Sequence, residues 1–322
     1  MDEVLIGSLL ASTLRVSTPL ILCALAGLFA ERSGVVDIGL EGKMLFSAFA
    51  AGAAGAAYGS LPLALCAAMA VAIVLSWMHG LACVSYRGDQ VVSGVAINIL
   101  ASGLTVVLSI AWFARGGQTP AVAEQVRLSA LWPTAMEYFS ASPAVVRVLV
   151  EALLTHNAMT YFSLALVPAV WWLLMRTRFG LRLRAVGENP QMVDAAGVSV
   201  QRLRYTALTL NGALCGLAGS CLVLAQSANF SHDMTAGRGY MALAALIFGR
   251  WRPFGTLFAC LLFGFLDAAA IRLQGFTIAG FGEVPVQWIQ ALPYVMTVVL
   301  LAGFVGKTVV PAALGKPYLK ER

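Results

Sequence analysis

Long apolar segments separated by short polar ones follow one another along almost the whole chain. Most hold about 20 residues, the length that an α-helix needs to cross the ~30 Å hydrocarbon core of a bilayer. The pattern predicts an all-α polytopic membrane protein with about nine transmembrane helices, in a range of about eight to ten, some of them short or broken. The apolar segments lie at 4–30, 33–59, 61–86, 91–113, 158–175, 205–226, 240–249, about 253–271 and 286–305.

The composition indicates the same class of protein. Of the 322 residues, 60% are hydrophobic and 11% are charged, whereas a soluble domain carries about a quarter charged residues. The first apolar segment follows Asp2 and Glu3 rather than basic residues, so we interpret it as a retained span and not as a signal peptide. Residues 1–322 are therefore interpreted as one transmembrane domain with no separate soluble domain.

The net charge of +6 is concentrated in membrane loops, which the positive-inside rule explains without nucleic-acid binding. The segment of about 176–205 carries six arginines against two acids, a net charge of +4, and is predicted to be a cytoplasmic loop. The segment of about 114–156 has no net charge and is predicted to be an external loop, with room for a short amphipathic helix. Counting spans from these loops places the N-terminus outside and the C-terminus in the cytoplasm.

No cofactor or metal site is predicted in this chain. All six cysteines lie within apolar segments, as small buried hydrophobic residues do, and they form no CxxC or Cys/His cluster. The sequence has no GxxxxGK[ST] pattern, so it has no P-loop for ATP. Because no Ser/His, di-Asp or metal constellation lies at membrane depth, an enzyme is the least favoured class.

The interior of the arginine-rich segment, GENPQMVDAAGV, predicts a short helix. Asn189 suits the N-cap, Pro190 suits the first turn, and Gly197 suits the C-terminal stop. One interpretation is a solvated loop whose arginines only fix the topology. The other, which we favour, is a docking element, because a capped helix on basic stems is more than topology requires.

Three segments resemble a known family of transport proteins. GLRLRAVGENPQMVDAAGVSVQRLRY resembles the coupling-helix region of permeases in the branched-chain amino acid/monosaccharide branch of ABC importers. ERSGVVDIGLEGKMLFSAFAA, residues 31–51, is similar to the signature of purine nucleoside permeases that work with lipoprotein partners, except that Asp37 stands where the pattern has Asn. GYMALAALIFGRWRPFGTLFACLLFGFLDA, residues 239–268, is the third match.

The resemblance implies a subunit of a multi-pass importer in the bacterial cytoplasmic membrane. Its expected partners are a cytoplasmic ABC ATPase that binds ATP, a second related permease chain and an external substrate-binding lipoprotein. The implied function is import of purine nucleosides such as guanosine and adenosine. The residues expected to couple the chain to the ATPase are Arg184, Glu188, Asn189, Pro190, Asp194 and Gly197.

Polar residues at membrane depth are candidates for the substrate path, since they are costly there without a function. They could hydrogen-bond a purine edge or ribose hydroxyls; the alternative is hydrogen bonding between helices. The candidates are Ser93, Asn98, Asn211, Gln226 and Asn229.

Three acids also lie within apolar segments. Asp267 is expected to pair with Arg272 near the membrane interface. Asp37 and Glu41, one helical turn apart, either form local i,i+4 contacts with neighbouring basic residues or mark a broken helix whose ends face the path.

Two other functions remain open from the sequence. The same assembly could import another small solute, such as riboflavin, a free base or a monosaccharide. A secondary transporter, coupled to protons through Asp37, Glu41 or Asp267, is the rival class.

Overall fold

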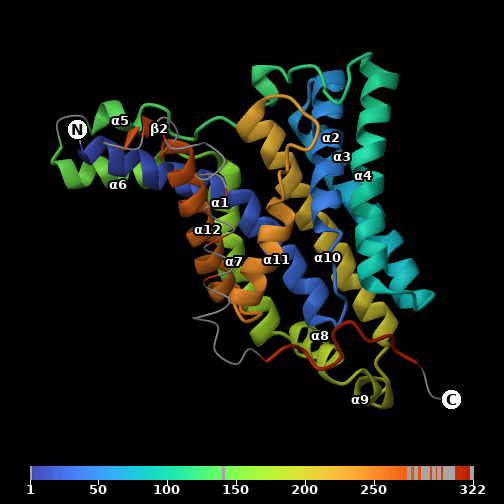
Figure 1. Cartoon of the computed structure of the whole chain (residues 1–322). Helices are drawn as coiled ribbons and strands as arrows, with labels where there is room; N and C mark the ends of the chain where they lie inside the picture. The colour runs from blue at the N-terminus through green and yellow to red at the C-terminus, as the bar shows by residue number, and fades with distance from the viewer. Residues whose placement is uncertain are drawn as a thin grey trace.

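The structure is a computed structural model and describes residues 2–139, 142–273, 277–278, 282–283, 291, 295, 299 and 309–319. Apart from one short strand pair, the described residues with regular structure are helical (Figure 1). The longer helices are α1 (Asp2–Arg32), α2 (Leu40–Tyr58), α3 (Leu61–Gly80), α4 (Gln90–Phe113), α7 (Ala158–Arg176), α10 (Val200–Cys221) and α12 (Pro253–Leu273). The shorter elements are η1 (Leu81–Ser85), η2 (Glu124–Val126), α5 (Ala135–Tyr138), α6 (Ala144–Leu154), α8 (Arg178–Glu188), α9 (Pro190–Ala195), η3 (Leu222–Ser227), α11 (Arg238–Phe248), β1 (Thr277–Ile278) and β2 (Gly282–Glu283).

The helices match the predicted apolar segments closely. Within the described residues, six helices are long and apolar enough to cross a membrane. The predicted segment at 33–59 is helical only from Leu40, as the 19-residue α2, and the predicted short segment at 240–249 corresponds to α11. The predicted last span, 286–305, and the loop before it lie largely outside the described residues.

Side-chain caps fix where several helices begin. The Asp89 carboxylate accepts hydrogen bonds from the amides of Val91 and Val92 and so starts α4. Asn157 and Ser199 cap α7 and α10 in the same way. Because the segments of about 114–156 and 176–205 lie at opposite ends of α7, the fold separates the uncharged loop from the basic one (Figure 1).

Small residues let α10 lie directly against α3, as its glycines predict. A Cβ atom on Gly212 would lie 2.6 Å from the Cα of Ile73, and one on Gly216 would lie 2.6 Å from the Cα of Met69. Alanines face these glycines from α3, including the fully buried Ala68. The contact between α3 and α10 is therefore made by backbone rather than by large side chains.

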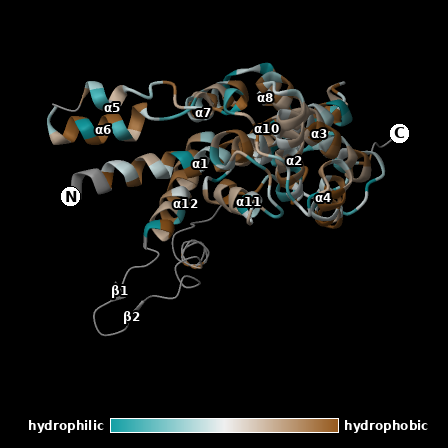
Figure 2. Ribbon diagram, turned by 90° about the horizontal axis from the view of Figure 1, so that it is seen from above, coloured by the Kyte–Doolittle hydropathy of each residue, from teal (hydrophilic) through white to brown (hydrophobic). Residues whose placement is uncertain are grey.

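The segment between α4 and α7 contains the short amphipathic helix that the sequence predicts, α6, preceded by the single turn α5. Pro143 stands at the N-cap of α6, where its fixed φ suits the start of a helix. Seen from above, α5 and α6 lie beside the N-terminal part of α1, away from the other helices (Figure 2). Glu151 of α6 contacts Gly7 of α1.

Candidate substrate path and coupling surface

A break between α1 and α2 places a buried ion pair inside the domain. Residues 33–39 are not helical, and Gly34 adopts a φ of +84°, which favours glycine. As a result the side chain of Asp37, six residues before Lys43, turns back towards α2. The Lys43 Nζ donates to Asp37 Oδ2 at 2.6 Å, and neither side chain is exposed to solvent. The broken-helix alternative therefore describes the geometry, and Asp37 is partnered by Lys43 rather than by its helical neighbours.

The ion pair continues into α10 and α3. Asn211 Oδ1 accepts hydrogen bonds from Lys43 Nζ at 3.2 Å and from Ser76 Oγ at 3.0 Å. Two buried atoms of this group, Asp37 Oδ1 and Asn211 Nδ2, have no hydrogen-bond partner among the described residues. A buried polar group of this kind is costly, so its presence where three helices meet marks a candidate functional position.

Glu41, at the start of α2, caps another helix instead of contacting a neighbouring basic residue. Its carboxylate accepts hydrogen bonds from the amides of Gly237 at 2.9 Å and Gly239 at 2.6 Å, the first residues around the N-terminus of α11. A carboxylate is stabilised there by free N–H groups and by the helix dipole. A Cβ on Gly239 would lie 2.6 Å from the Cα of Glu41, so this contact requires glycine.

Asn98 of α4 contacts the beginning of α2 and lines a cavity of about 330 Å³. Its Oδ1 accepts from the amide of Gly42 at 2.8 Å, and its Nδ2 donates to Ile38 O and to Tyr240 Oη. Asn98 and Asn211 thus contact successive residues of α2 from opposite sides. The cavity lies between α2, α4 and α11, and its other polar lining residues include Glu41, Ser102, Asp233, Thr235 and Tyr240.

The other predicted path residues are spread over different places. Ser93 is joined to this region through His79, whose Nδ1 lies 3.0 Å from Ser93 Oγ and whose Nε2 lies 2.9 Å from Val36 O. Gln226 instead donates to the carbonyl of Arg15, at the far end of α10. Asn229 is half-buried in the loop that follows η3.

Asp267 pairs with Arg238 of α11, with Nη2 and Oδ2 3.8 Å apart. The prediction that Asp267 pairs with Arg272 on the same helix is therefore wrong. The reason is the antiparallel packing of α11 against α12, which the spacing within one helix does not reveal.

The arginine-rich segment folds into two short helices, α8 and α9, at the other end of α7. As predicted, Asn189 caps α9 by accepting from the amide of Met192 at 3.0 Å, Pro190 is the first helical residue, and Gly197 follows with a φ of +78°. Arg184 of α8 is half-buried, and Asp194 of α9 lines the cavity described next.

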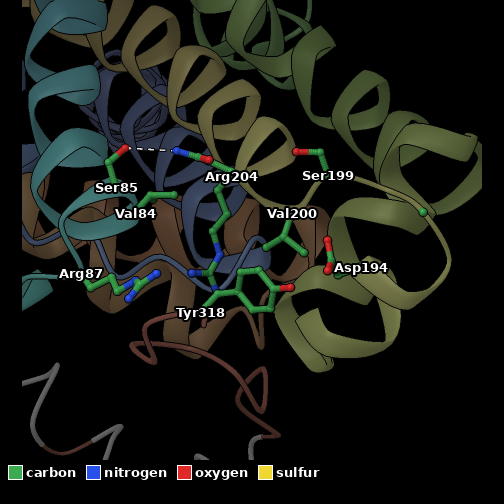
Figure 3. A pocket seen from close by; sticks show the side chains of 10 residues that line it. Val84, Ser85, Arg87, Asp194, Ser199, Val200, Arg204 and Tyr318 are labelled. Carbon is green, nitrogen blue, oxygen red and sulfur yellow. Dashed lines mark hydrogen bonds between the residues drawn. The ribbon is translucent and has the colours of Figure 1, made fainter. Parts of the chain in front are cut away.

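A cavity of about 350 Å³ lies beside α9 (Figure 3). Arg204 reaches into it from α10 towards Tyr318, with Asp194 on the opposite side. The Arg204 guanidinium is almost fully buried and donates to the carbonyls of Ser33 and Lys316. This arginine, predicted only as part of a basic loop, thus joins α10 to the break after α1.

Residues 309–319 have a structural role that the sequence did not predict. This segment runs beneath α8 (Figure 1), where the amide of Ala313 donates to Gly187 O at 2.9 Å and that of Gly315 donates to Gly34 O at 3.2 Å. The amide of Ala312 also donates to the Glu188 carboxylate. The basic residues near the C-terminus predicted only on which side of the membrane the tail lies, and no sequence pattern predicted these contacts.

Two apolar side chains on α8 and α9 are strongly exposed, which hydropathy alone could not reveal. Met192 is 70% exposed and Leu181 is 62% exposed. On the inner side, Val186, Val193 and Val200 form a buried cluster that fixes α9 against α8 and α10. The outward face thus combines arginines with apolar side chains, a composition typical of protein interfaces.

The segments that carried the family resemblance meet in space. The Arg32 guanidinium donates twice to the carbonyl of Trp251, at 3.0 and 2.7 Å, and the Trp251 indole donates to the Glu31 carboxylate. The same two segments meet again where Glu41 caps α11. These contacts tie residues 31–51 to residues 239–268, so the two motifs form one structural unit.

Among the described residues, the six long apolar helices and the buried polar group describe a polytopic membrane protein. A family model described as "Branched-chain amino acid transport system / permease component" matches residues 9–301, and the chain belongs to this family. It is thus a multi-pass membrane permease of an ABC importer, not an enzyme, and an ATPase is its partner.

Three relatives show how similar the chain is to other permeases. It is 37% identical to the guanosine ABC transporter permease NupQ of Bacillus subtilis, over 100% of both chains. It is 33% identical to TsgC13 of Haloferax volcanii, named provisionally as a glucose ABC transporter permease, over 98% of both chains. It is 28% identical to NupP, a second guanosine permease of Bacillus subtilis, over 81% of this chain and 73% of the relative.

Proposed function

We propose that this chain imports purine nucleosides, with guanosine and adenosine as its substrates, through an ABC complex. The observation that carries the proposal is the end-to-end similarity to a guanosine permease, which leaves no region of either chain unmatched. The provisional glucose permease is also similar over its full length, so a monosaccharide is the second candidate substrate.

The cavity bordered by Asn98 supports a small ring-shaped substrate. Its volume of about 330 Å³ is at the lower end of the range for small-molecule sites. The phenol ring of Tyr240, 47% exposed, offers a face on which a base can stack. The carboxylate of Asp233 is 62% exposed and can accept hydrogen bonds from the amino and imino groups of guanine.

We place α8 and α9 in the cytoplasm, with the N-terminus and α5–α6 outside. The net charge of +4 on 176–205, against none on 114–156, supports this orientation. In this arrangement the ATPase docks on the outward face of α8 and α9, contacting Met192 and the residues around it. Closure of the ATPase then moves α9, and Arg204 and residues 309–319 transmit that movement to the break before α2.

The complete importer contains a second, related permease chain and an external substrate-binding lipoprotein. Similarity to both NupQ and NupP, two guanosine permeases of one strain, supports a pair of different permeases. ATP is bound by the ATPase, since this sequence has no P-loop pattern. An external binding protein would supply much of the substrate selectivity.

Uptake by whole cells tests the substrate. Cells lacking this gene and cells carrying it on a plasmid are given radiolabelled guanosine, with unlabelled adenosine, riboflavin or glucose as competitors. The proposal predicts uptake that depends on the gene and is suppressed by adenosine only. Suppression by glucose or riboflavin would assign the importer to that solute, and uptake that survives deletion of the ATPase but collapses with the proton gradient would favour a secondary transporter.

A further inference from the structure

A basic cavity lies at the ends of α7 and α10 that are opposite to α8 and α9. It has a volume of about 420 Å³ and is bordered by the beginning of α7 and the end of η3. Three arginines line it, Arg15 from α1, Arg127 from the loop after η2 and Arg238 from α11. None of the candidate path or coupling residues except Gln226 borders it.

The positive charge of this basic cavity is only partly balanced. Asp267 lies 3.8 Å from Arg238 and is the one acid that pairs with any of the three arginines in the described part of the chain. The Nε atom of Arg127 is buried without a hydrogen-bond partner among the described residues. Taken with Asp267, the three arginines leave a surplus of two positive charges.

His156 also lines the cavity but adds no charge at neutral pH. Burial of its ring lowers the pKa of His156, which the hydrogen bond to the carbonyl of Ala152 only partly offsets, and the nearby charge of Arg15 lowers it further. The imidazole is therefore neutral, and the three arginines and Asp267 determine the electrostatics of the cavity.

The rest of the lining is mixed. Thr155, Asn157 and Gln226 are polar, whereas Val16, Leu128 and Ile271 form an apolar part of the wall, and Ile271 at the end of α12 is 53% exposed. A ligand that has both an anionic group and hydrocarbon chains can contact the arginines and the apolar residues of the lining at the same time. Guanidinium groups bind phosphate oxygens through paired, charge-assisted hydrogen bonds.

We propose that this cavity binds the phosphate group of an anionic phospholipid, whose acyl chains lie along α1 and α12. The ligand chemistry is a phosphate held by Arg15, Arg127 and Arg238 at the membrane boundary. A free phosphate shares that chemistry but leaves the apolar wall formed by Val16 and Ile271 uncovered. The site would hold the middle of α1, the beginning of α7 and the end of α12 together at the face opposite α8.

Lipid binding to the full chain, purified with its co-expressed partner subunits, tests this site. Native mass spectrometry would follow the number of bound lipids during titration with phosphatidylglycerol, with phosphatidylcholine, and with phosphatidylglycerol plus millimolar inorganic phosphate. Since each arginine near a lipid surface contributes about 1 kcal/mol, Arg15→Gln and Arg127→Gln should each weaken phosphatidylglycerol binding about fivefold.

Matched variants separate a specific site from a general loss of charge. Arg115→Gln removes an exposed arginine of the same external segment that does not line the cavity, and it should leave binding unchanged. Arg15→Lys keeps the charge but loses the paired hydrogen bonds of the guanidinium, so it should weaken binding less than Arg15→Gln does. Arg15 is exposed, so its variants test the site even if Arg127→Gln fails to fold.

Three results would overturn the assignment to a lipid. Equal binding of phosphatidylcholine would exclude an anionic-lipid site. Full displacement by inorganic phosphate would assign the site to the free anion. Unchanged lipid binding in the Arg15→Gln/Arg127→Gln variant, together with loss of an external protein partner, would show that the arginines serve a protein contact.

Discussion

The Lys43 ammonium lies 2.6 Å from the Asp37 carboxylate, and both side chains are completely buried in the membrane domain. The pair depends on the non-helical residues 33–39, because an unbroken helix would place residues six apart on different faces. Lys43 also bonds Asn211, so the pair joins the break to α10. Arg204, which like Asn211 belongs to α10, donates to the carbonyl of Ser33 within the break. Two side chains of α10 therefore contact the break or its ion pair.

The first prediction concerns this ion pair. Lys43→Met leaves the Asp37 carboxylate buried without its cation, and such losses cost about 3–5 kcal/mol. We expect a large drop in the thermal unfolding temperature of the purified complex. The double variant Asp37→Leu/Lys43→Met removes both charges and should recover most of that stability. Equal instability of the single and double variants would show that the packing of these side chains matters rather than their charges.

The second prediction concerns the close contact between α3 and α10. Gly216→Ala places a methyl group 2.6 Å from the Cα of Met69, and overpacking of this kind costs about 1–3 kcal/mol. The control is Gly103→Ala in α4, where a Cβ meets nothing within 4 Å and where replacing glycine in a helix stabilises by about 0.5–1 kcal/mol. Opposite shifts in unfolding temperature are expected. A neutral Gly216→Ala would mean that the two backbones do not lie this close.

Much of this architecture could be predicted from the sequence, because it depends on local signals. Hydropathy placed the spans, and the Asn189, Pro190 and Gly197 pattern located α9, since caps and turns are determined by neighbouring residues. The partners of Asp37 and Asp267 could not be predicted in the same way. Each depends on a break in a helix or on the packing of two helices, and for Asp267 the spacing within one helix pointed to the wrong neighbour, Arg272.

The third prediction tests α9 as the contact for the ATPase. Glu188→Ala/Asn189→Ala/Asp194→Ala removes the cap of α9, worth about 1 kcal/mol, and the carboxylate that receives the amide of Ala312. ATP hydrolysis should continue, but uptake should fall roughly tenfold, the factor that corresponds to about 1.4 kcal/mol of lost coupling.

The matched control for α9 is Arg202→Ala, an exposed change on α10 that leaves the α9 cap in place. Hydrolysis and uptake should both stay near their original values in this variant. If the triple alanine variant transported as efficiently per ATP as the unchanged protein, α9 would not be the docking element.

The fourth prediction concerns the C-terminal segment. Ending the chain at residue 308 removes the hydrogen bonds to Gly187, Glu188 and Gly34 and exposes the Arg204 guanidinium. Each lost hydrogen bond costs about 0.5–1.5 kcal/mol, so amide hydrogen exchange in α8 should accelerate and coupled uptake should fall. Removing only residues 320–322 is the control and should change neither. Unchanged exchange in α8 after the longer truncation would contradict a role for this segment in holding α8.

The most direct test of the account is transport by the purified complex, containing this permease, its partner permease, the ATPase and a binding protein, in proteoliposomes. The measurement is accumulation of radiolabelled guanosine on the side where the ATPase lies, with and without ATP. We expect accumulation that requires ATP, is insensitive to a proton gradient, and falls roughly tenfold in the Glu188→Ala/Asn189→Ala/Asp194→Ala variant. Accumulation driven by a proton gradient without ATP, or ATP-driven accumulation of glucose but not guanosine, would contradict it.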